Sequence, residues 1–216
     1  HDLSHPIQNI GNSCHLIVKL FDDSEYRATF RRTVDREFSS IKRVLEDLRH
    51  LARPIPLEHF PVDVNRSVSE VTESMQGLAD TADVSLDTRL SVDQPFIEGD
   101  VFALSRVYRN LVLNAIEATA PGGGVTLAVE EQEARVRISV RDTGTGIPHD
   151  RLENIFEDFE TTKRRGLGLG LAISRKIIDQ LGGEITVASR VGRGTTFQLE
   201  FDRVADSREV ATRAAN

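Results

Sequence analysis

Apolar side chains recur at alternating spacings of four and three residues over the first quarter of the chain. One run is Leu3, Ile7, Ile10, Cys14, Ile17 and Phe21, and the other is Val34, Phe38, Ile41, Leu45, Leu48 and Ala52. This spacing is typical of α-helices that pack along a coiled-coil seam. Asp22, Asp23 and Ser24 favour a turn between the two runs. The pattern predicts a helical hairpin over residues 1–53. Two helices alone leave part of each seam uncovered, so dimerisation into a four-helix bundle is the natural solution. A linker coiled coil without chemistry fits the heptads equally well.

The pattern changes after three closely spaced prolines, Pro54, Pro56 and Pro61, which indicate a stiff linker over residues 54–62. Beyond residue 63, helical and strand periods alternate. Helices are predicted over 65–79, 100–119 and 168–181, with Asp100 as the N-cap of the second. Strands are predicted over 84–90, 125–130, 135–141, 184–189 and 195–201. A mixed α/β sheet with helices on one face is the economical architecture.

The composition indicates which kinds of partner the protein can bind and in which compartment it resides. The 34 acidic residues outnumber the 27 basic ones, and the net charge of -7 argues against nucleic-acid binding. An anionic nucleotide can still bind through backbone N–H groups. A single cysteine, Cys14, favours a reducing compartment such as the cytoplasm. No apolar run approaches the roughly 20 residues that cross a bilayer. We therefore expect any membrane attachment to come through segments absent from this sequence.

Two pairs of polar residues are candidates for chemistry. His1 lies off the first seam, towards solvent, and Asp2 is its neighbour. An isolated histidine of this kind is usually only a solvated side chain. Asn110 and Asn114 lie one helical turn apart on an otherwise apolar helix, so both amides share a face. Asparagine is a mediocre helix former, and the pair suggests a shared ligand such as Mg²⁺, which prefers oxygen donors.

A glycine motif follows the strand predicted over 135–141. Asp142 stands at the strand end, with Gly144 and Gly146 after it. Glycines let the backbone approach a flat ligand closely, and the carboxylate can accept a hydrogen bond from an exocyclic amine. An ordinary turn is about equally compatible with this motif alone.

A second glycine motif opens the helix predicted over 168–181. Gly166, Gly168 and Gly170 alternate with leucines, of which Leu167 is the first. Each glycine costs about 1 kcal/mol relative to alanine inside a helix, so three require a reason. Exposed N–H groups at a helix start can hold phosphates. Lys163 precedes the motif and could meet phosphate charge, although a solvated basic turn is the simpler interpretation.

The order of the motifs resembles that of sensor histidine kinases. Residues 1–7 resemble the H-box, 110–115 the N-box, 142–148 the G1 box, 155–163 the F-box, 166–171 the G2 box and 192–197 the last glycine box. Any one box is weak evidence, but all six in family order are highly specific. The resemblance covers residues 1 to about 201, and residues 202–216 match none of it and are expected to form a tail.

The resemblance implies a hairpin for dimerisation and histidine phosphotransfer, followed by an ATP-binding α/β sandwich of the GHKL ATPase type over 63–201. It implies ATP and Mg²⁺ as cofactors, homodimerisation through the hairpin, and the receiver domain of a response regulator as partner. His1 would accept the phosphoryl group, with Asp2 as its proton acceptor.

The resemblance also implies roles in the nucleotide site. Asp142 would bind the adenine amine with support from Thr195. Asn114, with Asn110, would hold Mg²⁺, and Lys163 would contact phosphate from a lid over residues 149–167. Glu117 departs from the family, because many members carry a basic residue there. His5 also departs, since threonine or asparagine is common at that place, which puts phosphatase activity in doubt.

Two other classes share part of this pattern. A GHKL ATPase or protein-serine kinase would have a similar nucleotide site, but it would not need the H-box or the heptad hairpin. A scaffold without catalysis would be expected to have lost Asn114, Asp142 or a glycine of the G2 box, and all are present.

Overall fold

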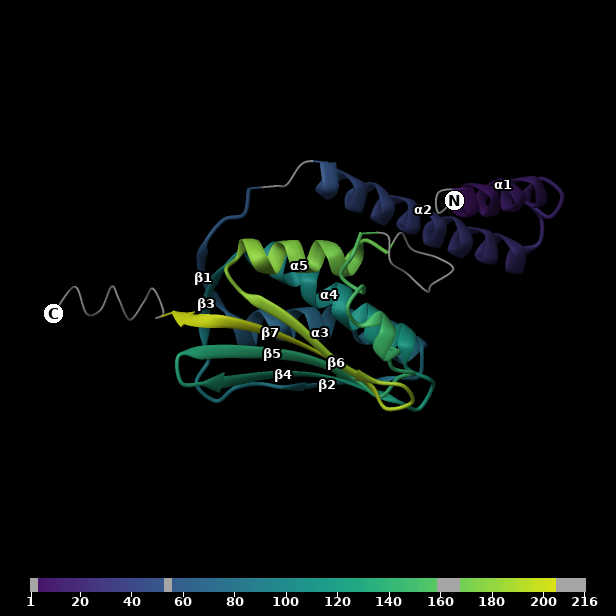
Figure 1. The fold of residues 1–216 in the computed structure, drawn as a ribbon. Helices are drawn as coiled ribbons and strands as arrows, with labels where there is room; N and C mark the ends of the chain where they lie inside the picture. The colour runs from purple at the N-terminus through teal and green to yellow at the C-terminus, as the bar shows by residue number, and fades with distance from the viewer. Residues whose placement is uncertain (1–3, 53–55, 159–167, 205–216) are drawn as a thin grey trace. The chain divides into compact units, whose positions relative to one another are not determined.

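A computed structural model describes residues 4–52, 56–158 and 168–204 (Figure 1). This part of the chain divides into two compact units. One contains residues 4–52, Asp158 and 168–173, and the other contains 56–157 and 174–204. Five predicted site residues lie outside the described residues, namely His1, Asp2, Lys163, Gly166 and Leu167.

The first unit contains the predicted helical hairpin, formed by α1 (Ser4–Ile17) and α2 (Ser24–Ala52). Asp23 caps α2, because its Oδ1 accepts hydrogen bonds from the backbone N–H groups of Glu25 (2.9 Å) and Tyr26 (3.1 Å). The prediction that Phe21 belongs to the α1 seam is wrong. α1 ends at Ile17, because the chain must turn before it reaches Asp23, the N-cap of α2. Phe21 therefore lies in the connection between the helices and is 63% exposed.

Polar contacts hold the two helices of the hairpin together. Asn9 of α1 donates from Nδ2 to Oε1 of the buried Glu37 of α2 at 3.2 Å. The Tyr26 hydroxyl donates to the carbonyl oxygen of Ser13, also at 3.2 Å. These bonds fix the register of α1 against α2.

The side chains of Leu48 and Ala52 in the predicted α2 seam lie outside the described ones, and the other four divide into two sets. Val34 and Ile41 are half-buried. Phe38 and Leu45, one heptad apart, are 59% and 54% exposed. We call Phe38 and Leu45 the outer stripe of α2. Its exposure agrees with the expectation that a single hairpin cannot cover its own apolar positions.

A mixed seven-stranded sheet forms the second unit. The strands are β1 (Phe60–Asp63), β2 (Ser85–Arg89), β3 (Phe96–Gly99), β4 (Gly124–Gln132), β5 (Arg135–Asp142), β6 (Glu184–Arg190) and β7 (Gly194–Val204). Their order is β1-β3-β7-β5-β4-β2, and β6 also pairs with β7. Only β2 and β4 are parallel to each other among the described strand pairs. The predicted mixed sheet is confirmed.

Helices cover one face of this sheet. They are α3 (Val64–Thr81), α4 (Val101–Ala118) and the 174–180 part of α5 (Gly170–Gln180) (Figure 1). The side chains of Leu127, Ile138 and Leu199 face these helices from adjacent strands and are fully buried. Asp100 caps α4 as predicted, because its Oδ1 accepts from the N–H groups of Phe102 (2.8 Å) and Ala103 (3.0 Å). The result is the two-layer α/β sandwich expected of a GHKL ATPase.

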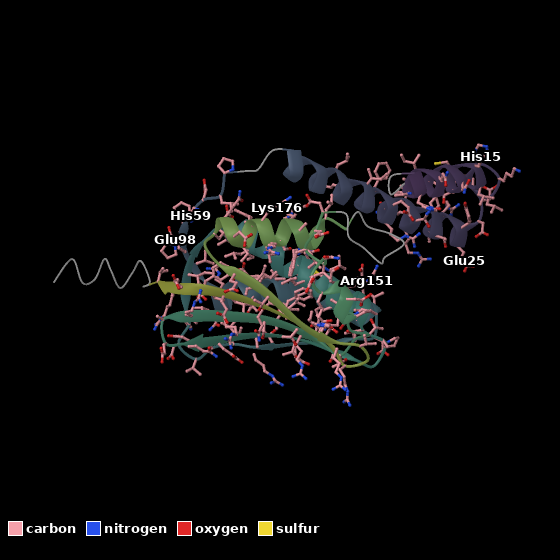
Figure 2. All side chains as sticks on the ribbon, in the orientation of Figure 1. His15, Glu25, His59, Glu98, Arg151 and Lys176 are labelled. Atoms are coloured by element: carbon pink, nitrogen blue, oxygen red, sulfur yellow. The ribbon has the colours of Figure 1, made fainter. Side chains whose placement is uncertain are left out.

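Pairing with distant strands explains where the elements differ from the predicted ones. β1 begins at Phe60, inside the stretch interpreted as a linker, and pairs with β3, which no pattern predicted. His59 and Glu98 lie together at this edge, with 3.9 Å between Nδ1 and Oε1 (Figure 2). β7 runs past the predicted end at residue 201 because Arg203 and Val204 pair with β3.

The helix α5 begins at Gly170 and not at Gly168 as predicted, because the φ of +69° at Gly168 is not helical.

In the ranges 4–52, 56–158 and 168–204, no helix combines the length and apolarity needed to span a membrane.

Candidate nucleotide site

Asp142 is a buried carboxylate at the end of β5, with 4% of its surface exposed. Its Oδ1 accepts hydrogen bonds from the backbone N–H of Gly144 at 2.8 Å and of Thr195 at 3.1 Å. No described residue donates a hydrogen bond to Oδ2. The structure therefore brings three predicted site residues together and leaves one carboxylate oxygen able to accept a hydrogen bond from a ligand.

Burial raises the pKa of the Asp142 carboxyl, and the hydrogen bonds from Gly144 and Thr195 act in the opposite direction. Desolvation penalises the charged form, while the two amide donors stabilise it. A carboxylate held in such surroundings binds a ligand N–H more strongly than one in water, because the effective dielectric constant is lower.

Two glycines allow the backbone segments of the site to come into close contact. A Cβ at Gly144 would collide with the carbonyl oxygen of Ala118, at the end of α4. Gly146, at φ +71°, has no room for a Cβ because the carbonyl oxygen of Arg190 lies there. These positions require glycine for space, and Gly146 requires it for its backbone angle as well.

Backbone hydrogen bonds clamp the loop that follows β5. The Thr145 N–H donates to the carbonyl oxygen of Ala118 at 3.1 Å. The Thr145 carbonyl oxygen in turn accepts from the Gly192 N–H, in the β6–β7 turn, at 2.8 Å. The end of α4, the loop that follows β5 (residues 143–148, the G1 loop) and the β6–β7 turn thus form one connected framework around Asp142.

Ser189 of β6 is part of this framework, although no motif pointed to it. Its hydroxyl oxygen accepts from the Ile147 N–H at 2.8 Å, donates to the Gly194 carbonyl oxygen at 3.0 Å and lies 2.9 Å from the Thr195 hydroxyl oxygen. A single serine within a strand carries no sequence signal, so it could be found only from the structure.

The two predicted metal-ligand asparagines lie on α4. Both Asn110 and Asn114 are half-buried. The Asn110 Nδ2 donates to the hydroxyl of the buried Ser174, on α5, at 3.0 Å. This bond orients the Asn110 amide and leaves its oxygen able to act as a ligand atom. The described residues contain no group of three or more His, Cys, Asp or Glu side chains that could hold a metal ion. The donor set is thus an amide pair, which fits Mg²⁺ shared with phosphate oxygens.

Comparison with known proteins assigns the family. Residues 99–205 match the family described as histidine kinase-, DNA gyrase B-, and HSP90-like ATPase. Sensor histidine kinase ZraS of Escherichia coli (strain K12) is 32% identical over 199 residues, which are 92% of this chain and 43% of ZraS. The catalytic domain of histidine kinase ThkA is 33% identical with a TM-score of 0.62, over 68% of this chain and 96% of that domain. The chain belongs to the sensor histidine kinase family.

Longer structural matches include the helical hairpin as well as the α/β sandwich. ThkA in complex with response regulator protein TrrA aligns with 96% of this chain and 60% of that chain, at 28% identity and a TM-score of 0.76. Full-length ShkA in complex with AMPPNP aligns with 93% of this chain and 47% of that chain, at 29% identity and a TM-score of 0.71. This core spans less than half the length of ZraS.

Proposed function

We propose that this core uses ATP to phosphorylate His1 and then transfers the phosphoryl group to an aspartate of a response regulator receiver domain. The observation that carries the proposal is the arrangement of Asp142, with Oδ1 bonded to two backbone amides and Oδ2 able to accept from a ligand. ShkA was crystallised with an ATP analogue and ThkA with a response regulator, and both relatives support the assignment.

In this proposal, the nucleotide base lies against the Asp142 framework. Asp142 accepts a hydrogen bond from the 6-amino group of adenine through Oδ2. Gly144 and Gly146 let the loop after β5 pack closely against Ala118 and Arg190 around the base, and Thr195 lies beside Asp142. The phosphates are assigned to the second glycine motif and to the basic residue before it, namely Gly166, Leu167, Gly168, Gly170 and Lys163.

Asn114 and Asn110 would hold Mg²⁺ through their side-chain oxygens. When bound, the ion neutralises charge on the phosphate oxygens. The bond from Asn110 to Ser174 supports this role, because an amide anchored through its nitrogen presents its oxygen in a fixed direction.

The proposed reaction consists of two phosphoryl transfers. A ring nitrogen of His1 forms a bond to the γ-phosphorus, the bond from that phosphorus to the β–γ bridging oxygen breaks, and ADP leaves. Asp2 accepts the proton from the other ring nitrogen, which is typically worth about 10²–10⁴-fold in rate. In the second step the P–N bond breaks as a carboxylate oxygen of the receiver aspartate binds the phosphorus.

We further propose that residues 1–53 dimerise and residues 63–201 bind ATP. The outer stripe of α2 is the surface that supports dimerisation, since Phe38 and Leu45 are apolar and more than half exposed in one chain. We assign the core to the cytoplasm, where ATP is available and an exposed thiol such as that of Cys14 stays reduced.

Incubation with ATP labelled in its γ-phosphate tests the assignment of the acceptor. His1→Gln should abolish the acid-labile label while leaving ATP affinity unchanged. His15→Gln is the matched control, because His15 is an exposed histidine on α1 (Figure 2). Full labelling of His1→Gln, or loss of label only in His15→Gln, would show that His1 is not the acceptor.

A further inference from the structure

Three polar side chains lie in one row across adjacent strands at the nucleotide site. Ser189 of β6 is paired directly with Thr195 of β7. Arg141 of β5 is paired with Thr196, so the next position places Asp142 beside Thr195. Residues directly opposite each other in an antiparallel pair have side chains on the same face. The row is therefore Asp142, Thr195 and Ser189, and only the first two were predicted from the motifs.

The hydrogen bonds of Ser189 determine where its proton lies. A serine hydroxyl has one donor and two acceptor positions. Its proton goes to the Gly194 carbonyl oxygen, which can only accept, and one lone pair takes the Ile147 N–H. The remaining contact, to Thr195 Oγ1 at 2.9 Å, then uses the second lone pair, so Thr195 is the donor. All three positions of the Ser189 hydroxyl are occupied.

The direction of this bond determines what Thr195 offers to a ligand. Its only proton points towards Ser189, so Thr195 Oγ1 has only lone pairs left, on the same face of the sheet as the neighbouring Asp142 carboxylate. Two neighbouring acceptors match a base with an N–H₂ group at its edge, directly or through a water molecule. These two acceptors disfavour a base with a carbonyl oxygen at the same place, because hydrogen-bond acceptors on the protein and on the base then face each other.

We infer that Ser189 is a positioning residue that makes the site select 6-aminopurine over 6-oxopurine nucleotides by holding the Thr195 hydroxyl as an acceptor. This inference rests on the proposed ATP binding and names a residue that determines its specificity. Without the Ser189 hydroxyl, the Thr195 proton is released from its acceptor and can turn to donate to a 6-oxo oxygen. The preference for adenine then falls.

Ser189 also ties the G1 loop to β6 and β7 through Ile147 and Gly194, so its loss affects the framework as well. The two roles have different consequences. A looser framework weakens binding of all purine nucleotides by the same factor. A released Thr195 hydroxyl changes the ratio of the two affinities.

Calorimetric titration with ATP and with inosine triphosphate, both with Mg²⁺, separates these roles. Inosine triphosphate has an oxo group at position 6 where ATP has an amino group, and it carries a proton on N1 where ATP has none. Ser189→Ala should lower the ratio of ATP to inosine triphosphate affinity about tenfold, the effect of one redirected hydrogen bond. Ser189→Thr keeps the hydroxyl and should keep the ratio. Ser139→Ala is the matched control, on the opposite face of β5.

Thr195→Ala provides a second variant that leaves the bonds from Ser189 to Ile147 and Gly194 in place. It should lower the ratio to a similar extent, and adding Ser189→Ala to it should change the ratio no further. An unchanged ratio in Thr195→Ala, or an equal loss of both affinities in Ser189→Ala, overturns the inference while ATP binding itself stands. Failure of the unmodified chain to bind either nucleotide overturns the proposed function and the inference with it.

Discussion

Gly194 lies directly against the backbone of Asp142, so that a Cβ built on this glycine would overlap the Asp142 carbonyl oxygen. The φ angle of Gly194 is +95°, which side-chain-bearing residues rarely adopt. The close approach brings the start of β7 to the end of β5, where the Thr195 N–H reaches the Asp142 carboxylate. Glycine is therefore required at position 194 for two independent reasons.

Gly194→Ala is expected to destabilise the α/β sandwich by about 2 kcal/mol or more, since an unfavourable φ and a backbone collision add together. Gly122→Ala is the matched control, because Gly122 has a φ of +80° but nothing within 4 Å of an added Cβ. The control should cost only the backbone strain, about 1 kcal/mol. Urea denaturation measures both, and equal losses would contradict the role of the Asp142 contact.

Asp142→Asn is expected to weaken ATP binding about 10- to 100-fold without destabilising the fold. Asparagine keeps an oxygen for the Gly144 and Thr195 N–H groups, but it replaces Oδ2 with an N–H₂ group that cannot accept from an amine. Calorimetry with ATP and thermal unfolding without it give the two measurements. Retained affinity would show that Oδ2 does not bind the base.

The stability of the unmodified chain and that of Asp142→Asn should depend differently on pH. Since burial raises the pKa of Asp142, the folded state holds its proton to a higher pH than the unfolded state does. The stability of the unmodified chain should thus fall relative to Asp142→Asn as pH rises from about 3.9, the ordinary aspartate value, through the raised pKa. Denaturation at several pH values measures this difference, and a difference of the opposite sign would show that the hydrogen bonds from Gly144 and Thr195 outweigh the effect of burial on the Asp142 pKa.

Asn114→Ala is expected to remove the dependence of ATP affinity on Mg²⁺, because an alanine offers no oxygen to the ion. The measurement is ATP binding with Mg²⁺ and with a chelator. Asn65→Ala is a suitable control, since Asn65 is a buried asparagine bonded to Ser91, in a different part of the sandwich. If Asn114→Ala kept the full Mg²⁺ effect, the metal role of this asparagine would have to be abandoned.

Phe38→Glu is expected to convert a dimer of the core into monomers, because a charge in the outer stripe of α2 must be desolvated on association. Sedimentation velocity over a range of concentrations measures the change. Val92→Glu introduces the same charge at a position that is 95% exposed in the other unit, and it should leave the association unchanged. Dimers of Phe38→Glu with unchanged affinity would exclude the outer stripe from the interface.

Local signals were sufficient to predict much of the fold. The heptads gave the hairpin, because an apolar stripe on a helix is a property of neighbouring residues. Asp100 was predicted as a cap and accepts two N–H groups of α4. Alternation along β4 and β5 predicted both strands, since each has one face on the core.

Features that depend on distant partners were not predicted. β1 and β3 are only four residues each, too short for a periodic signal, and their pairing joins residues far apart in the chain, β1 with β3 and β3 with β7. In the site, the motifs predicted that Asp142, Gly144 and Thr195 belong together. They gave no indication of Ser189 or of Ser174, because a hydroxyl becomes part of a network only through folding.

The long strand β7 has a dynamic consequence for the nucleotide site. It is 11 residues long and is paired along most of its length with β5 on one side and with β6 and then β3 on the other. Amides of such a central strand should exchange with deuterium only when the whole sandwich unfolds. Thr195 stands at the start of this strand, so we expect the edge proposed to bind the base to be rigid before the nucleotide arrives. Protection gained on binding should then concentrate in the glycine loops and leave β7 almost unchanged.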